Sequence, residues 1–364
     1  MRIVHVANAW AAHSGGIRTT LRALGTGYRE AGHELVVVTP GGSPEDISRE
    51  WGRHVVLPGL AVPGSGGYRA LTRLRPVTDL LDALRPDRLE VSDRLTLRGL
   101  GDWARSAGVP STVFLHEQLA GVLAAFSPFG PDRWRPVVDR HNAGTVERFD
   151  RVVTTTRFAA RELERIGAAT EHVPLGVDLA LFRPRLRAVR PPDAPLVVVC
   201  SRLSREKRPD LAVDALDHLA RRGVRARLVV AGDGPARRTL QRMARGRPVT
   251  FVGHLPERRA VADLLGAADV VLAPGPIETF GLAALEALAC GTPVVAARTS
   301  ALAELVVGDA GAVADPDPAA LADAVAQVLA VPPARRRAAA RARAEEFPWD
   351  RTTARLLALH GAAA

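Results

Sequence analysis

Two cations, Arg202 and Lys207, lie five positions apart in the segment SRLSREKRPD, residues 201–210. Lys207 is the only lysine of the chain, because every other residue among its 49 lysines and arginines is an arginine. A lysine ammonium is a compact point charge, whereas an arginine guanidinium forks to two oxygens, so the pair suits a diphosphate. A single lysine in so arginine-rich a chain favours this role over that of a solvated basic loop.

Two carboxylates, Glu278 and Glu286, lie eight positions apart in GPIETFGLAALEALACGTPVVAA, residues 275–297. On one continuous helix they would point about 80° apart, because each residue turns about 100°. If the helix instead begins near Gly281, Glu278 lies in the loop before it and Glu286 in its second turn. One carboxylate can then accept hydrogen bonds from a sugar and the other from a ribose diol.

The backbone between these glutamates suits an anion. The N–H groups of Phe280, Gly281 and Leu282 would point at the ligand, aided by the helix dipole. Glycine at 281 lets the backbone approach the ligand closely. The segment therefore predicts a phosphate-binding helix start.

These residues need a scaffold of parallel strands. Short apolar runs alternate with longer helical patterns, which is typical of strands joined by crossover helices. The predicted strands are RIVHVA, ELVVVT, RLEVS, STVFL, RVVTT and HVPL, then LVVVCSRL, RLVVAG, VTFVG, VVLAP and PVVAA. Helices are predicted at LRALGTGYREAG, closed by Gly32, and at DLAVDALDHLARRG.

The length of 364 residues predicts two domains. The Pro- and Arg-rich segment 183–195 has no periodicity and is predicted to be the linker between domains 1–182 and 196–346. The fold class predicted is α/β, with two doubly wound Rossmann-like domains facing across a cleft. In such sheets ligands bind at the carboxyl ends of the strands, and Arg202 and Lys207 follow one of them.

The composition limits the classes of molecule that the protein is expected to bind. A net charge of +10 and a pI near 11.0 suit nucleic acid, an anionic membrane surface or a phosphorylated small molecule. An aromatic content of 4% offers few stacking platforms and no nucleic-acid motif is present, so we expect no nucleic acid. Two cysteines without close spacing favour a reducing cytoplasm. We see no signal-peptide pattern and no apolar run of about 18 residues, which predicts a cytoplasmic or peripheral protein.

The motifs together resemble a known family. In chain order, GGIRTTLRALGTGYREAGHEL, HVPLGVDLALFRP, SRLSREKRPD, VVAGDGP, VTFVGHLP and PIETFGLAALEALACGTPVV resemble the retaining glycosyltransferases of family 4, which have the two-domain GT-B fold. Within that family VANAWAAHSGGIRTTL, GSGGYRAL, LEVSDRLTLRGLG, VFLHEQL and VVTTTRFA look like the GDP-mannose-dependent mannosyltransferases of the phosphatidylinositol mannoside type.

The resemblance implies roles for the donor-binding residues. Arg202 and Lys207 would hold the donor diphosphate and stabilise the leaving nucleotide. Glu286 would bind the ribose. Glu278, with the amides of Phe280 and Gly281, would hold the donor sugar and its phosphate.

The family also implies roles for residues elsewhere. Gly15 and Gly16 would let the amino-terminal domain close on the phosphate, the alternative being an ordinary turn. His116 in FLHEQL would line the sugar site rather than serve structure alone. Glu257 in GHLPERR lies near the family's base-binding loop and would favour guanine, the alternative being an exposed surface glutamate. The final helix, 347–364, would pack back on the first domain.

The reaction implied is sugar transfer with retention at the anomeric carbon. No carboxylate is placed as a nucleophile, which favours front-face attack, while double displacement would need an acid beneath the sugar ring. We expect no obligatory metal and no cofactor beyond the nucleotide-sugar donor. The only D-x-D pair, Asp315 and Asp317, indicates a helix start.

The acceptor is less defined by the sequence. In residues 63–86, Tyr68, Leu71 and Leu74 alternate with arginines, so a helix here could lie on an anionic membrane, such as the inner face of the plasma membrane; the alternative is packing on its own sheet. The arginines of 335–343 are predicted to line a solvated helix face. A UDP-sugar-dependent enzyme with a small-molecule or natural-product acceptor remains an alternative, as does a nucleotide-sugar epimerase. The G-x-G of VVAGDGP is a weak indication of a dinucleotide oxidoreductase, because it lacks the third glycine.

Overall fold

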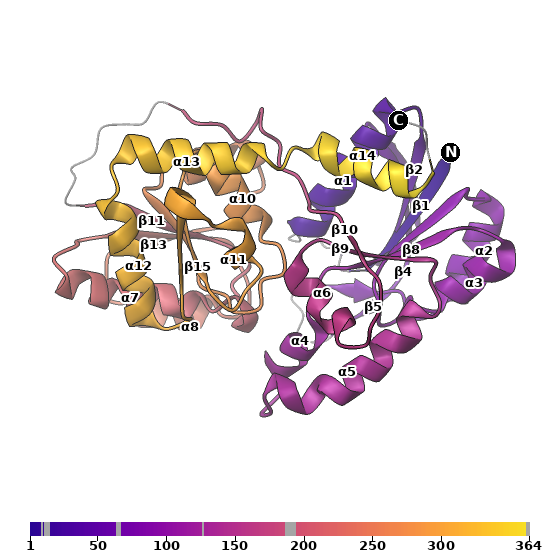
Figure 1. The fold of residues 1–364 in the computed structure, drawn as a ribbon, viewed down its shortest axis with the longest axis horizontal. Coiled ribbons are helices and arrows are strands. Elements are labelled where there is room, and N and C mark those ends of the chain that lie inside the picture. The colour runs from indigo at the N-terminus through magenta and orange to yellow at the C-terminus, as the bar shows by residue number, and fades with distance from the viewer. Residues whose placement is uncertain (9, 11–14, 63–66, 126, 186–193, 362–364) are drawn as a thin grey trace. The chain divides into compact units, whose positions relative to one another are not determined.

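The computed structural model describes the chain except residues 9, 11–14, 63–66, 126, 186–193 and 362–364. The chain forms two compact units, one of Met1–Gly176 with Trp349–Ala364 and one of Val177–Pro348. Each unit is a parallel sheet flanked by helices (Figure 1), as the α/β prediction required. Most of the predicted linker, residues 186–193, lies outside the described residues.

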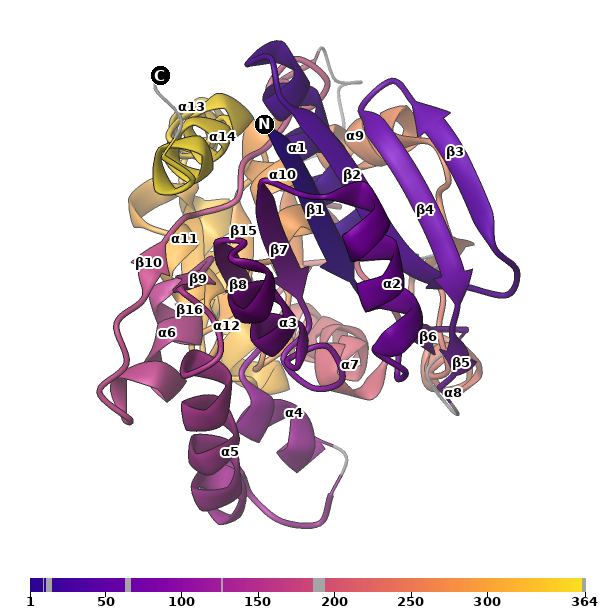
Figure 2. The same cartoon turned by 90° about the vertical axis from the view of Figure 1, so that its right-hand side faces the viewer.

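The first unit has an eight-stranded sheet in the order β10-β9-β8-β7-β1-β2-β4-β3, seen with its strands side by side in Figure 2. All described neighbours are parallel except β3 and β4, which are antiparallel. The strands are β1 (Arg2–Ala7), β2 (Glu34–Gly41), β3 (Glu45–Arg49), β4 (Gly52–Pro58), β7 (Arg88–Ser92), β8 (Ser111–Leu115), β9 (Arg151–Thr154) and β10 (Glu171–His172). A separate antiparallel pair is β5 (Leu60–Ala61) with β6 (Arg69–Ala70).

The helices of this unit are α1 (Gly16–Glu30), α2 (Arg75–Leu84), α3 (Leu100–Ala107), α4 (Leu119–Ala125), α5 (Pro131–Val146), α6 (Arg157–Glu164) and α14 (Trp349–Leu359). Side chains of β1 alternate between two cores, as expected of a strand covered on both faces. Val4 and Val6 join the core beneath α2 and α3. Ile3 and Ala7 join the core that contains residues of α1 and α14.

The second unit has a six-stranded, all-parallel sheet in the order β13-β12-β11-β14-β15-β16. Its strands are β11 (Leu196–Cys200), β12 (Arg227–Ala231), β13 (Val249–Gly253), β14 (Val270–Ala273), β15 (Val294–Ala297) and β16 (Gly311–Ala314). Its α-helices are α7 (Pro209–Arg221), α8 (Arg237–Met243), α9 (Arg258–Ala267), α10 (Leu282–Ala289), α11 (Leu302–Leu305), α12 (Pro318–Ala330) and α13 (Pro333–Glu345), with short 3-10 turns η1 (Arg205–Lys207) and η2 (Gly308–Ala310). Apolar residues of α7 and α12 pack with β11, β12 and β14 in one of its cores.

Residues 63–66 of the segment 63–86 lie outside the described residues, and the described part does not form the membrane-surface helix that we considered. Its helix, α2, begins at Arg75, and Leu71 before it is only 3% exposed. Val77 and Leu81 of α2 are fully buried against the sheet. The apolar face therefore packs on its own sheet, whereas Arg73 and Arg75 stay exposed.

The β3–β4 edge was not predicted from the sequence. Strand β3 is mostly exposed and polar, so it lacks the apolar alternation by which strands are recognised. No helix among the described residues is long and apolar enough to cross a membrane.

Candidate functional site

The loop after β11 holds Arg202 in a fixed position. Its guanidinium pairs with Glu206, and its Nε lies 3.2 Å from the Ser204 hydroxyl oxygen. Ser204 donates a hydrogen bond of 2.6 Å to Glu206. Burial opposes ionisation of Glu206, yet the Ser204 hydrogen bond and the Arg202 charge bring its pKa below the usual value. Arg202 is thus a cation braced at the carboxyl end of a strand, where ligands are expected.

Lys207 ends the same loop and meets Glu278 from the loop after β14. Its Nζ lies 2.5 Å from Glu278 Oε2, and the side chains are 24% and 22% exposed. Burial raises the pKa of Glu278, but the Lys207 charge and the N–H groups of Thr279 and Phe280 outweigh it and leave the pKa below its usual value. The structure therefore brings together Lys207 and Glu278, two predicted site residues 71 positions apart.

The loop after β12 supports the Arg202 loop by close packing. Gly232 has a φ of +127°, and a Cβ there would lie 1.9 Å from the Ser201 carbonyl oxygen. The amide of Leu203 donates to the Asp233 carbonyl at 2.9 Å. Glycine in VVAGDGP is therefore required by the approach of one loop to another, and not by a dinucleotide fingerprint.

Helix α10 begins where the sequence indicated. Gly281 is its N-cap with a φ of +77°, and a Cβ there would lie 2.4 Å from Leu302 Cδ2. Glu278 lies in the loop before the helix, and Ala301 holds its carbonyl oxygen with a 2.8 Å hydrogen bond. The Phe280 amide donates a hydrogen bond to Glu278. Of the three amides expected to face an anion, those of Gly281 and Leu282 therefore remain at the helix start.

Glu286 lies in the second turn of α10 and is 9% exposed. Arg258 of α9 approaches its Oε1 to 3.3 Å. Burial raises the pKa of Glu286 to about 7; Arg258 opposes the rise and Asp178 adds to it. Glu286 is therefore a carboxyl group that titrates near neutral pH.

The arginine run in α13 is not the solvated face that we predicted. Arg337 donates to the carbonyl oxygens of Gly266 and Cys290, at the ends of α9 and α10. Arg341 donates to the carbonyls of Phe182 and Ala289 at 2.9 and 3.0 Å. Cations stabilise helix C-termini because the last carbonyls lack intrahelical partners. The run therefore anchors the helices that carry Arg258 and Glu286.

The remaining donor-side predictions fall at element ends. Glu257 is the N-cap residue of α9 and is exposed. Asp317 accepts hydrogen bonds from Ala319 and Ala320 and so begins α12, which confirms the helix-start interpretation. Asp315 lies 3.4 Å from Arg298.

In the first unit, Gly15 is the N-cap residue of α1 and Gly16 begins that helix. A Cβ at Gly15 would meet nothing within 4 Å, and its φ is −79°, so neither packing nor conformation requires glycine there. Residues 11–14 of the same loop lie outside the described residues. The phosphate role of both glycines remains a prediction.

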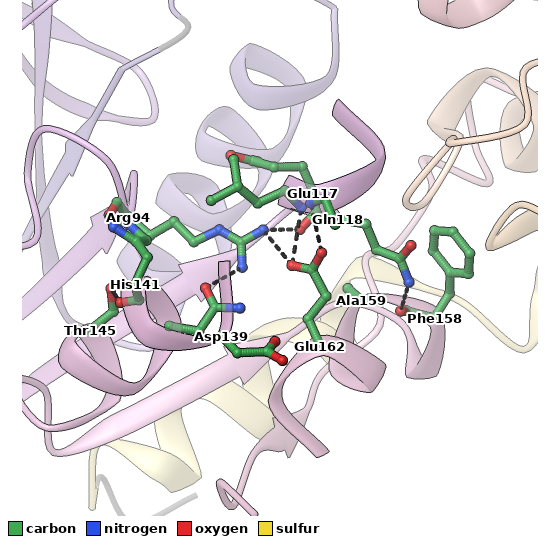
Figure 3. Close-up of polar contacts among 12 residues, drawn as sticks. Arg94, Glu117, Gln118, Asp139, His141, Thr145, Phe158, Ala159 and Glu162 are labelled. Atoms are coloured by element: carbon green, nitrogen blue, oxygen red, sulfur yellow. Dashed lines mark hydrogen bonds and ion pairs between the residues drawn. The ribbon is translucent and has the colours of Figure 1, made fainter. Parts of the chain in front are cut away.

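His116 follows β8, in a loop held by a buried ion pair. Figure 3 shows Arg94 and Glu162 pointing toward each other beside Glu117, with 3.2 Å between Arg94 Nη2 and Glu162 Oε2. Arg94 also donates to the Glu117 carbonyl. Glu162 accepts from the first two amides of α4 at 3.0 and 2.8 Å. The pair thus holds both ends of the turn between His116 and α4.

A chain of buried hydrogen bonds leads away from His116. Its Nε2 lies 2.8 Å from Ser92 Oγ, which lies 2.7 Å from His5 Nε2. His5 Nδ1 lies 2.7 Å from Glu90 Oε2, because His5 and Glu90 are register partners in β1 and β7. Burial, followed by the charges of His5 and Arg94, lowers the pKa of His116 to about 4, so this imidazole is neutral at pH 7.

Sequence reasoning missed the residues that brace the site. They include Ser204 and Glu206 around Arg202, Arg94 and Glu162 around the His116 loop, and the chain from Ser92 to Glu90. A polar residue inside an otherwise apolar strand, as in RLEVS and RIVHVA, was the available signal.

Two family models match the chain, one in each half. Residues 15–177 match the family model described as glycosyl transferase 4-like domain, and residues 184–345 match the one described as glycosyl transferases group 1. The chain is 48% identical, over 100% of its length and 97% of the relative's, to a GDP-mannose-dependent alpha-(1-6)-phosphatidylinositol dimannoside mannosyltransferase of Mycobacterium tuberculosis. It is 40% identical to a D-inositol 3-phosphate glycosyltransferase of Xylanimonas cellulosilytica, over 59% of this chain and 57% of that one.

Solved structures show the same fold. Sucrose-phosphate synthase from Thermosynechococcus elongatus has a TM-score of 0.79 at 22% identity, covering 99% of this chain and 98% of that one. Anabaena HepE in complex with UDP and glucose has a TM-score of 0.74 at 16% identity, covering 99% of both chains. The chain is an enzyme that transfers a sugar and belongs to the GT-B glycosyltransferases that join a glycosyl transferase 4-like domain to a group 1 domain.

Proposed function

We propose that this enzyme transfers mannose from GDP-mannose to a hydroxyl group of a phosphatidylinositol mannoside, with retention at the anomeric carbon. The observation that carries the proposal is the similarity, over the whole chain, to a relative named for that donor and that type of acceptor. The braced cations and carboxylates of the second unit support it, because a nucleotide diphosphate sugar offers partners for each of them.

Arg202 and Lys207 bind the donor diphosphate in this proposal. A lysine ammonium has three donors, and Glu278 takes one of them, so two N–H groups stay available for phosphate oxygens. The amides of Gly281 and Leu282 at the start of α10 add two uncharged donors. Together these groups stabilise the negative charge that develops on the departing GDP.

Glu278 and Glu286 recognise hydroxyl groups of the donor. Glu278 has a pKa below its usual value and is therefore a carboxylate that can accept from the sugar. Glu286 accepts from the ribose diol and does so best above the pH at which it ionises, about 7. Glu257 is exposed at the start of α9, where its carboxylate can accept hydrogen bonds from the N–H groups on the edge of a guanine base.

The chemical step is front-face displacement with retention. The leaving phosphate takes the proton of the acceptor hydroxyl while the new glycosidic bond forms on the face that GDP leaves. In this proposal His116 also contacts the sugar, and Gly15 and Gly16 also contact the phosphate. Because two side-chain cations already face the phosphates, no metal is obligatory, and transfer should persist in EDTA.

The acceptor places the reaction at an anionic membrane surface on the cytoplasmic side. The net charge of +10 and the exposed Arg73 and Arg75 support such an association. Co-sedimentation with phosphatidylinositol vesicles, lost at high salt and absent with phosphatidylcholine vesicles, is the expected result.

The test begins with calorimetry of GDP, UDP, ADP and GDP-mannose against the purified protein. Selective binding of the guanine nucleotides is expected, and Glu257→Gln should reduce the preference for GDP over UDP. Mannose transfer to phosphatidylinositol dimannoside and an α-linked product by NMR would establish the reaction and its stereochemistry. A preference for uridine nucleotides would replace the proposal with a UDP-sugar enzyme, and a β-linked product would refute retention.

A further inference from the structure

The hydrogen-bond chain that ends at His116 begins at one buried carboxylate. Glu90 of β7 is fully buried and is bonded by three side chains. Tyr28 donates its hydroxyl to Oε1 at 2.8 Å, His360 Nε2 lies 2.8 Å from the same oxygen, and His5 Nδ1 lies 2.7 Å from Oε2. Burial opposes ionisation of Glu90, but the hydrogen bonds from His360 and His5 hold its pKa well below the usual value. Glu90 is therefore a carboxylate inside the sheet.

A buried charge needs a counter-charge, because an isolated ion in the interior costs far more than a paired one. Two imidazoles contact Glu90, and only one of them can carry the extra proton at low cost. His360 Nδ1 is buried without a hydrogen-bond partner among the described residues, so a proton on it would be an unsatisfied buried donor. Both ring nitrogens of His5 have oxygen partners, Glu90 Oε2 and Ser92 Oγ. A positive counter-charge would therefore have both of its N–H groups hydrogen-bonded only on His5.

A positive charge on His5 would fix the direction of every following hydrogen bond. A charged His5 is a donor at both nitrogens, so Nε2–H donates to Ser92 Oγ. The single hydroxyl proton of Ser92 must then point at His116 Nε2, 2.8 Å away. Because Nε2 accepts and this imidazole is neutral at pH 7, its one proton is on Nδ1.

We propose that Glu90, a positively charged His5 and Ser92 act as positioning residues that hold His116 in its Nδ1–H tautomer, so that His116 presents a hydrogen-bond donor to a hydroxyl group of the bound sugar. The contact with sugar rests on the proposed function, whereas the tautomer does not. Arg88 helps to close the network, since its Nε and Nη2 donate to the His360 carbonyl at 3.0 and 2.8 Å. The C-terminal segment thus supplies His360, 270 positions from Glu90, to the same carboxylate.

The test reads the tautomer directly in the ligand-free full-length protein. Long-range ¹H–¹⁵N correlation spectra of ¹⁵N-histidine-labelled protein at pH 7 separate a protonated ring nitrogen from one with a lone pair. The chain has ten histidines, and the signals lost in His116→Gln assign His116. We expect Nδ1 protonated and Nε2 unprotonated.

Two variants and one matched control test the cause. Ser92→Ala removes the hydroxyl that directs the proton, and Glu90→Gln removes the charge, so in both the His116 signals should move toward the Nε2–H form that a free imidazole prefers. The control is Thr39→Ala, because Thr39 bonds another buried histidine of the same sheet, His54, at 2.8 Å. It should leave the His116 signals unchanged, while unshifted His54 signals show that the other variants are folded.

Two results would overturn the proposed control of the His116 tautomer by Glu90, His5 and Ser92. The first is an Nε2–H tautomer in the wild-type protein, a measurement that needs no variant to fold. The second is an unchanged tautomer in both variants. Mannose transfer tests the contact with sugar. Ser92→Ala should lower kcat about tenfold, the size expected for one net hydrogen bond, with the KM for GDP-mannose unchanged. The expected tautomer together with normal kcat would refute the sugar contact and leave the tautomer assignment intact.

Discussion

Glu286→Gln should make the protein more stable and a poorer nucleotide binder, and the stability gain should depend on pH. In the folded chain the pKa of Glu286 is raised from 4.5 to about 7, mainly by burial. Between these two pH values the folded state keeps a proton that the unfolded state has lost, so this carboxyl group contributes less stability as the pH rises. Above pH 7 the whole penalty is present, up to about 3 kcal/mol for a shift of this size.

Glutamine keeps the shape and an acceptor oxygen for Arg258 but cannot ionise. At pH 8 we therefore expect Glu286→Gln to raise the midpoint of thermal unfolding by up to about 6–12 °C, at ~2–4 °C per kcal/mol. At pH 5 only about 1 kcal/mol of the penalty remains, so the gain should shrink to a third of its size or less. Differences between variant and wild type cancel the other titrating groups.

The assay is differential scanning calorimetry at pH 5 and pH 8, with Glu257→Gln as the control because Glu257 is exposed. GDP titrations should show an affinity at pH 8 that is ~10–100-fold weaker for Glu286→Gln, since hydrogen bonds to a charged group are lost. An equal rise in the unfolding midpoint at both pH values would refute the argument that ionisation of Glu286 lowers the stability of the folded protein. An unchanged GDP affinity would refute its role at the ribose.

Three further variants test the site and its support. Lys207→Ala should abolish most turnover, by ~10²–10³-fold as for loss of a charge-stabilising donor, with an unfolding midpoint close to wild type; near-normal activity would remove Lys207 from the diphosphate site. Gly281→Ala should destabilise the protein by at least about 1–2 kcal/mol, because φ is +77° and the Cβ would meet Leu302 at 2.4 Å; urea unfolding measures it, and an unchanged midpoint would show that the helix start adjusts freely. Arg94→Met should cost about 3–5 kcal/mol by leaving the Glu162 charge buried; a urea-measured loss below about 1 kcal/mol would mean that Glu162 is satisfied by the α4 amides alone.

The sequence by itself determined the fold class and the loops in which the proposed donor-site residues lie. Apolar runs such as LVVVC and STVFL form parallel strands because both faces of each sheet are covered. A loop after such a strand lies at the ligand-binding edge, so Arg202, Lys207 and Glu278 could be selected from local pattern alone. Gly281 marked the start of α10 because its backbone adopts a positive φ, which a side chain disfavours.

Only the tertiary structure decided which of these groups are in contact and how burial changes the free energy of ionising them. Lys207 binds Glu278 because β11 and β14 are neighbours in the sheet, an adjacency that no local pattern encodes. The arginines of α13 looked like a solvated face, yet Arg337 and Arg341 bind the carbonyl ends of α9 and α10. His360 reaches Glu90 only because α14 packs with α1 on the face of the sheet to which Glu90 points. Burial and partner choice arise from contacts between distant segments, and for that reason the charge states of Glu90, His116 and Glu286 follow from the folded chain and not from its order of residues.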